Sequence, residues 1–187
     1  MKHLVRSKKG LSTVVTTLII LVVAVLLATA VTFYAINVVS TRVQEESLQI
    51  YKQHIWHNGT TFAEASFMII NTGGRDFVID KISVRGQECA WNTAYYAKTT
   101  NSISPDLTYV TPNTNGTLLG KSVTLGTATY NLLPASNDLI LKSGWSMILY
   151  ITNPDSISVN DIGVTVGFTV FTANAQYYKE CHVAASA

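Results

Sequence analysis

Few of the residues that commonly carry out chemistry stand at spacings that a reaction requires. No HExxH, CxxC, Walker-loop or GxSxG pattern occurs in the chain. His54 and His57 are three residues apart, a spacing that on a helix lets two imidazoles share a metal ion. Because no cysteine or third histidine stands near them, a solvated surface is the simpler interpretation. The sequence therefore predicts no enzyme, no cofactor and no metal site.

Two kinds of residue are candidates for covalent modification. Asn58 and Asn115 each begin the sequence Asn-Gly-Thr, an acceptor motif for N-glycosylation that coincides here with a predicted turn. Such motifs also arise by chance in a chain rich in threonine. Cys89 and Cys181 are too few for a disulfide framework, but in an exported protein they could form one bridge. The other interpretation is two separate buried thiols.

The composition argues against nucleic-acid binding and favours export. Only 13% of the 187 residues are charged, about half the share of a typical soluble domain. Four of the 13 basic residues stand in the first nine positions, so nine basic residues face 11 acidic ones in the remainder, a net charge of −2. That remainder has no basic patch of the kind that nucleic acids need. Thr, Ser and Asn supply its polar surface, as suits an exported protein.

The most distinctive stretch lies between Gly10 and Arg42, where 31 consecutive residues include no charge, glycine or proline. A helix that is apolar on every side must be enclosed by lipid or by other helices. About 20 such residues span a bilayer. Three interpretations are open: a secretory signal cleaved after Ala30, a single-pass anchor with its basic leader in the cytoplasm, or a helix kept after cleavage between Gly10 and Leu11.

Two features favour the helix that is kept. The apolar stretch is longer than the ~7–15 residues of a signal-peptide core. Helix-compatible sequence then continues to His57, with Leu48, Tyr51 and Ile55 on one face. A helix over residues 11–57 would be ~70 Å long, more than twice the hydrocarbon thickness of a bilayer. A signal peptide has no use for that length.

From about Thr60 the hydrophobic period changes from that of a helix to that of a strand. The clearest alternation is in residues 162–171, where one face carries Ile162, Val164, Val166, Phe168 and Val170. Further strands are predicted at residues 62–70, 76–84, 106–111, 121–131, 145–151 and 176–184. Residues 98–117 are rich in Thr, Asn and Ser, which predicts a long surface loop. Many short strands separated by turns predict an antiparallel, β-sandwich-like (immunoglobulin-like) domain.

The N-terminal arrangement resembles a known family. Lys8-Lys9-Gly10 followed by Leu11-Ser12-Thr13, a long apolar helix and a β-rich body is similar to an archaeal type IV pilin with a class III signal peptide. That group includes the archaellins, and the resemblance covers the leader and helix, roughly 50 residues, and the body only in architecture. It implies that a membrane peptidase cuts after Gly10 and leaves Leu11 as the mature N-terminus. Bacterial pilins usually carry Glu at the fifth mature position; Val15 stands there in this chain, so pairing of that Glu with a neighbouring N-terminus is not expected.

The predicted fold is α+β and has three parts. They are a cleaved leader at residues 1–10, a hydrophobic and then amphipathic helix at residues 11–57, and an outer β-rich domain at residues 58–187. By the resemblance, the helix is the membrane anchor of the precursor and later the filament core. The side chains expected to line that core are Val14, Leu18, Leu21, Val25, Leu26 and Phe33.

The resemblance implies a structural subunit of an extracellular filament, used for adhesion to surfaces. Its implied partners are further copies of the chain, a prepilin peptidase, an assembly ATPase and a membrane platform, with the membrane as its site before assembly. Two alternatives stay open. One is an archaellin of a motility filament, and the other is a membrane-anchored or secreted β-domain that binds a ligand.

Overall fold

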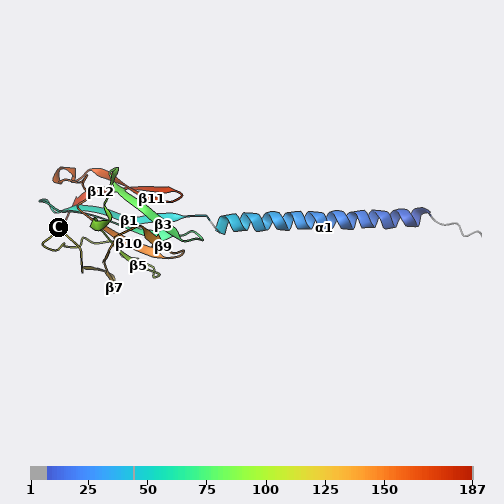
Figure 1. The fold of residues 1–187 in the computed structure, drawn as a ribbon, viewed down its shortest axis with the longest axis horizontal. Helices are drawn as coiled ribbons and strands as arrows, with labels where there is room; N and C mark the ends of the chain where they lie inside the picture. The colour runs from blue at the N-terminus through green and yellow to red at the C-terminus, as the bar shows by residue number, and fades with distance from the viewer. Residues whose placement is uncertain (1–7, 44, 187) are drawn as a thin grey trace, which may run out of the picture. The chain divides into compact units, whose positions relative to one another are not determined.

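The computed structural model describes residues 8–43 and 45–186, and the chain divides into two compact units, one up to position 43 and one after it. The fold class is α+β, as predicted: a long N-terminal apolar helix is followed by a mostly antiparallel, curled β-sheet domain (Figure 1). The helix, α1, spans Lys8–Val43 and has 36 residues. No glycine or proline interrupts it after its first turn, so its backbone hydrogen bonds continue along the whole length.

The helix is shorter than the sequence predicted, and this part of the prediction is wrong. Leu48–His57, expected to continue it, form strand β1. Leu48 and Ile55 are buried, but Tyr51, which the helical pattern placed on the same face, is 44% exposed. β1 pairs antiparallel with β2 (Ala63–Asn71) along most of its length. Such cross-strand pairing outweighs a local pattern that fits a helix, because burial against a neighbouring strand supplies most of the stability.

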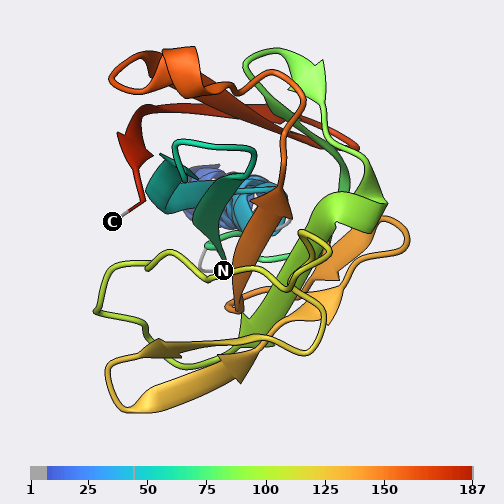
Figure 2. The ribbon, with the colours of Figure 1, turned by 90° about the vertical axis from the view of Figure 1, so that its left-hand side faces the viewer.

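The other strands follow β2 in the chain. They are β3 (Phe77–Val84), β4 (Gln87–Glu88), β5 (Ala94–Thr99), β6 (Ser122–Leu125), β7 (Ala128–Asn131), β8 (Leu133–Pro134), β9 (Leu139–Leu141), β10 (Ser146–Thr152), β11 (Thr165–Thr172) and β12 (Gln176–Ala185). Two short 3-10 helices are η1 (Trp91–Thr93) and η2 (Val159–Asp161). The main sheet has the order β4-β3-β11-β12-β1-β2-β10-β5-β8, with β9 beside β3, while β6 and β7 form a separate hairpin. Figure 2 shows the curl of the sheet.

The β-domain has two apolar cores, on opposite faces of β2 and β10. The first lies inside the curl, where the rings of Phe67 in β2 and Phe168 in β11 are 5.1 Å apart and both fully buried. The second includes Met68 of β2 and Ile148 of β10, which are covered by later residues such as Leu107. Because β2 and β10 are covered on both faces, nearly every one of their residues is buried.

Residues 100–121, between β5 and β6, form neither helix nor strand, and we name this segment the strap. Its position agrees with the long loop predicted at residues 98–117. The strand predicted at residues 106–111 is wrong, because Leu107 and Val110 are buried three residues apart rather than in alternation.

Most other strand predictions agree with the structure. The segments predicted at residues 62–70, 76–84, 145–151, 162–171 and 176–184 correspond to β2, β3, β10, β11 and β12. Residues 121–131 fold as the β6–β7 hairpin rather than as one strand. In β11, Val166, Phe168 and Val170 are buried as predicted, but Ile162 and Val164 precede the strand and are about 40% exposed.

Candidate functional site

The first candidate is the surface of α1, which is apolar all round. Its span from Ser12 to Thr41 has a mean hydropathy of 2.9 in its most apolar window, and none of that window is buried within the chain. The side chains predicted to line a filament core are 57–70% exposed: Val14, Leu18, Leu21, Val25, Leu26 and Phe33. By length and composition the helix is compatible with insertion in a membrane or with a signal sequence.

Six polar side chains of α1 are bonded to the backbone of the helix itself. The hydroxyl of Thr29 donates to the carbonyl of Val25 at 2.7 Å, and the Asn37 amide donates to the carbonyl of Phe33 at 2.9 Å. Bonds of the same kind are made by Thr16, Thr17, Thr32 and Thr41. A hydroxyl paired in this way adds little cost when the helix enters an apolar surrounding. The helix is therefore chemically suited to lipid or to packing against other helices.

The expected cleavage site lies at the start of α1. The helix begins at Lys8, so Gly10 and Leu11 both lie in its first turns. Cleavage between them stays a prediction. The leader residues before Lys8 lie outside the part of the chain that the structure describes.

Both predicted glycosylation acceptors lie in exposed turns. Asn58 follows β1, and its Oδ1 accepts hydrogen bonds from the backbone N–H groups of Thr60, Thr61 and Phe62 at 2.9–3.0 Å. A glycan is attached through Nδ2, the other end of the same amide, so these turn bonds and a glycan are compatible. Asn115 lies in a turn of the strap. Glycosylation at both positions stays a prediction.

The two cysteines do not form the predicted bridge, and both are free, half-buried thiols. The N–H of Cys89 donates to the carbonyl of Ile82 in β3, whereas Cys181 lies in β12 opposite Val166 of β11. Cys89 follows β4 and lies on the side of β3 away from β11, and β11 is followed in the sheet by β12. About three strand spacings of ~4.8 Å therefore separate the two cysteines, whereas a disulfide needs Cα atoms within ~7 Å. Burial raises the pKa of Cys89 to about 11 and that of Cys181 to about 12.

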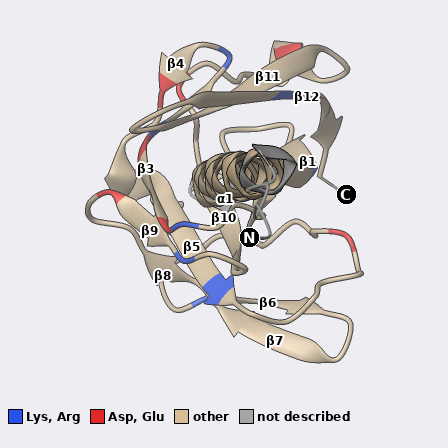
Figure 3. Ribbon diagram, turned by 90° about the vertical axis from the view of Figure 1, so that its right-hand side faces the viewer, with Lys and Arg blue, Asp and Glu red and all other residues tan. Residues whose placement is uncertain are grey.

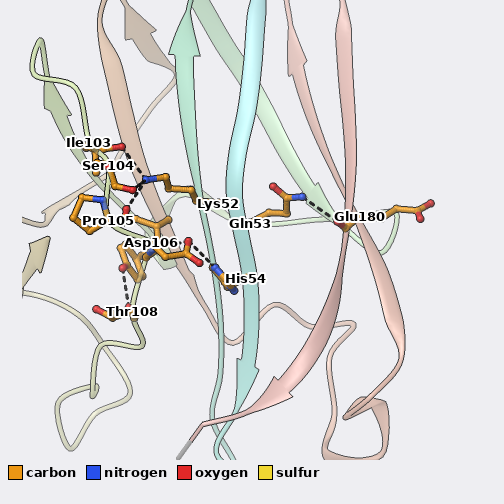
Figure 4. A network of polar contacts seen from close by, with 11 residues as sticks. Lys52, Gln53, His54, Ile103, Ser104, Pro105, Asp106, Thr108 and Glu180 are labelled. Atoms are coloured by element: carbon orange, nitrogen blue, oxygen red, sulfur yellow. Dashed lines mark hydrogen bonds and ion pairs between the residues drawn. The ribbon is translucent and has the colours of Figure 1, made fainter. Parts of the chain in front are cut away.

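The second candidate is a polar network that holds the strap against β1 and β2 (Figure 4). Nζ of Lys52 donates to three successive strap carbonyls, those of Ile103, Ser104 and Pro105, at 2.5–2.8 Å. Lys52 lies where the register of β1 with β2 shifts, and its φ of 52° is in the left-handed region. The irregular backbone at this β-bulge turns the side chain out of the strand alternation and toward the strap.

Two further side chains of the sheet bind the strap. Nε2 of His54 lies 2.9 Å from Oδ1 of Asp106, and the hydroxyl of Tyr150 donates to the carbonyl of Thr108 at 2.8 Å. The His54 ring is stacked on Trp56, with 5.0 Å between ring centroids. Desolvation is the largest single effect and raises the pKa of Asp106. The hydrogen bonds from His54 and from the Leu107 N–H, with the charges of His54 and Lys52, together outweigh it, so the net pKa lies below its usual range. Asp106 is therefore ionised at neutral pH.

Glu64 in β2 completes the network. It is fully buried, and its Oε1 accepts a hydrogen bond from the N–H of Val110 at 3.0 Å. Within the described chain, Glu64 Oε2 and Ser66 Oγ are buried without a hydrogen-bond partner. Desolvation raises the pKa of Glu64 to about 8, and the bond from Val110 opposes this only in part. The carboxyl is therefore mostly protonated at pH 7.

The network holds a loop in place beside a shallow hollow. An open hollow of about 460 Å³ is lined by Lys52, Gln53, His54, Ser104 and Asp106. The ammonium group of Lys52 in this hollow is already bound to backbone carbonyls, and the imidazole of His54 is bound to the carboxylate of Asp106. Over residues 8–43 and 45–186, no three His, Cys, Asp or Glu side chains gather closely enough to hold a metal ion. Figure 3 shows Lys and Arg scattered over separate elements of the β-domain.

The structure also separates the two histidines that the sequence placed together. His54 and His57 lie on a strand, so an offset of three residues puts them on opposite faces. Nδ1 of His57 accepts the N–H of Gly59 at 3.0 Å. Lys52 and Glu64 are not among the residues that the sequence singled out. A single acid among the apolar residues of β2 was the one available signal, and nothing in the sequence indicates the bulge at Lys52.

Among known proteins, the chain has a weak structural likeness and no match to a family model or to a curated protein. Among solved structures, a family 123 glycoside hydrolase from Clostridium perfringens is similar over 74% of this chain, with 9% sequence identity and a TM-score of 0.31. The chain spans 27% of that structure's length. A likeness this weak carries no argument about fold or activity.

Proposed function

We propose that this chain is a structural subunit of an extracellular filament, assembled through α1, with the β-domain on the outside. The observation that carries the proposal is α1 itself: 30 residues without a charge, apolar on every side, and attached to a β-domain that is compact without it. A surface of that kind needs an apolar partner along its whole length. Copies of the same helix, packed together, supply one.

The expected course of assembly follows from how helices behave in lipid. The precursor rests in the membrane through α1, and a peptidase removes the leader. Transfer of an apolar helix from lipid to a helix bundle gains little hydrophobic free energy, because lipid tails are about as apolar as leucine. Packing supplies the attraction, and an assembly ATPase with a membrane platform is the expected source of work. Once assembled, the apolar helices are shielded from water, so the filament is expected to resist dissociation.

Two measurements on material sheared from cells test the proposal. Mass spectrometry of the mature N-terminus should give Leu11, and electron microscopy should show regular fibres that contain this chain. A mature chain that begins at Val31 has lost most of α1 and contradicts the proposal. Adhesion is the role we expect for the fibres, and swimming cells that lose motility with this chain would indicate the archaellin alternative.

The second candidate is a single β-domain tethered to the membrane, which binds a ligand of its own. It is favoured by the same span, since the length of Ser12–Thr41 suffices for one crossing of a bilayer. The two candidates differ in the number of copies of the chain that associate at the cell surface. Chemical crosslinking of intact cells should give a ladder of multimers for a filament subunit and monomers for a tether.

A further inference from the structure

The strap covers an apolar face that would otherwise meet water. Beneath it lie residues of β2, β5 and β10, namely Met68, Tyr95, Ala97, Ile148 and Tyr150. The strap contributes its own buried side chains to the same core: Ile103, Leu107, Val110 and Leu118. Since the strap has no strand ladder of its own over these residues, its position depends on that apolar contact and on the polar network described above.

Glu64 differs from the other members of that network. Lys52 and His54 are partly exposed and bind carbonyls or a carboxylate, whereas Glu64 is fully buried and bonded through one oxygen to Val110. Its other oxygen has no partner in the described chain. A neutral carboxyl is tolerated at such a place, but a carboxylate there is a buried charge with too few hydrogen bonds.

The groups around Glu64 do not compensate its charge. The phenols of Tyr109 in the strap and Tyr150 in β10 are both affected by Glu64, which raises their pKa after the larger effect of desolvation. From β1, the neighbouring titratable group is His54, which is engaged by Asp106 of the strap. Nζ of Lys52 is held by strap carbonyls. Within the described chain, the ion pairs found do not include Glu64.

We propose that Glu64 is a proton-controlled latch: while its carboxyl is protonated the strap stays closed, and loss of the proton drives the strap off the sheet. Water can then reach the carboxylate, and the N–H of Val110 is released with the rest of the segment. Opening exposes the apolar face of β2 and β10. The latch belongs to the β-domain alone and does not depend on the filament proposal.

The sign and size of the effect follow from linkage. The closed strap holds the pKa of Glu64 at about 8, and contact with water returns it toward the ordinary value of 4.5. The open state therefore loses its proton first as the pH rises. Between about pH 4.5 and pH 8 the ratio of open to closed strap should rise roughly tenfold per pH unit, and it should level off above that range.

Oxidation of methionine by hydrogen peroxide can report this opening, because the chain carries its own reference. Met68 lies beneath the strap and is 3% exposed, while Met147 lies in the other core, inside the curl of the sheet, and is 0% exposed. The full-length chain in detergent micelles is treated with peroxide at pH 5, 6, 7 and 8. Conversion of each thioether to its sulfoxide is then followed by mass spectrometry.

In the wild-type chain, oxidation of Met68 should accelerate at least tenfold from pH 5 to pH 8, while that of Met147 stays slow. Glu64→Gln keeps an acceptor for the Val110 N–H but cannot ionise, so it should abolish the acceleration; Glu88→Gln, at an exposed carboxyl in β4, should leave it unchanged. The proposal is overturned if the Met68 rate does not change with pH or rises equally in Glu64→Gln. It is also overturned if Met147 accelerates in step, since the whole domain would then open. If Glu64→Gln fails to fold, the wild-type oxidation rates of Met68 and Met147 still test whether the strap alone opens as the pH rises.

Discussion

Nζ of Lys52 lies 2.6 Å from the carbonyl oxygen of Ser104, and this contact joins β1 to a segment 52 residues further along the chain. The ammonium group also bonds the carbonyls on either side of Ser104, so one side chain fixes three consecutive residues of the strap. A strand that was expected to be helix therefore provides the main polar attachment of the longest loop in the β-domain.

Replacement of Lys52 by methionine should weaken the fold. The change removes three charge-assisted hydrogen bonds and keeps a side chain of similar length, while the unfavourable φ of 52° is the same for both residues. We expect the free energy of unfolding in urea to fall by about 1–3 kcal/mol. The matched control is Lys179→Met at an exposed position of β12, which should change it by less than about 0.5 kcal/mol. Equal effects of the two variants would contradict the role given to Lys52.

Glu64 should give the β-domain an unusual dependence of stability on pH. Its pKa is raised from 4.5 to about 8 in the folded chain, so its stabilising effect is complete below pH 4.5 and is lost as the pH rises through 8. The difference between these two pKa values corresponds to a change of roughly 5 kcal/mol in the free energy of unfolding. Urea unfolding between pH 4 and pH 9 should show wild-type stability falling over this range, and a flatter profile for Glu64→Gln. A profile that Glu64→Gln leaves unchanged would refute this assignment.

A charge within α1 should stop assembly without harm to the β-domain. Asp in place of Leu21 or Leu26 lies near the middle of the apolar span, where a carboxylate costs about 2.5–3.5 kcal/mol in lipid. We expect no membrane insertion or no fibres, as judged by cell fractionation and electron microscopy. Circular dichroism of the β-domain should be unchanged. Leu119→Asp, at an exposed leucine of the strap, is the control and should still assemble. Fibres formed by Leu21→Asp would contradict a buried helical core.

Both cysteines should remain thiols in the purified protein. Unfolding in the absence of reductant, followed by alkylation, should add two labels per chain. In the folded chain alkylation at pH 8 should be slow, because burial raises the pKa of Cys89 to about 11 and that of Cys181 to about 12, which leaves little thiolate. A chain that takes up no label until it is reduced would show that a bridge does form.

How far the sequence predicted the fold depended on whether burial followed a local period. β11 alternates because one face meets the core and the other does not, so Val166, Phe168 and Val170 could be recognised. In β1, Leu48 and Ile55 also fit a helical spacing, and the bulge at Lys52 breaks the alternation that would have shown a strand. Partners in a sheet are distant in sequence, and no local pattern specifies them.

Of the candidate functional features, one could be predicted from the sequence and the other could not. α1 could be found from the sequence, since 31 residues without a charge allow few structures. The latch could not, because the burial of Glu64 depends on where the strap lies, and the strap has no periodic pattern. The cysteine prediction failed for a related reason. Counting thiols does not show that β11 and β3 lie between Cys181 and Cys89.

The parallel contact between β1 and β12 has a consequence for how this domain is made. Ile55 to His57 lie beside Val183 to Ala185, and Gln53 donates to the carbonyl of Glu180 at 3.1 Å, so the first strand of the domain meets its last across the join of the sheet (Figure 4). A nascent chain cannot complete this join before β12 has been synthesised. Until then the inner faces of β1 and β2 have no cover from the other half of the sheet, and such exposed strands are prone to aggregate. A chaperone or the translocation machinery is therefore expected to hold the growing polypeptide until its final strand arrives.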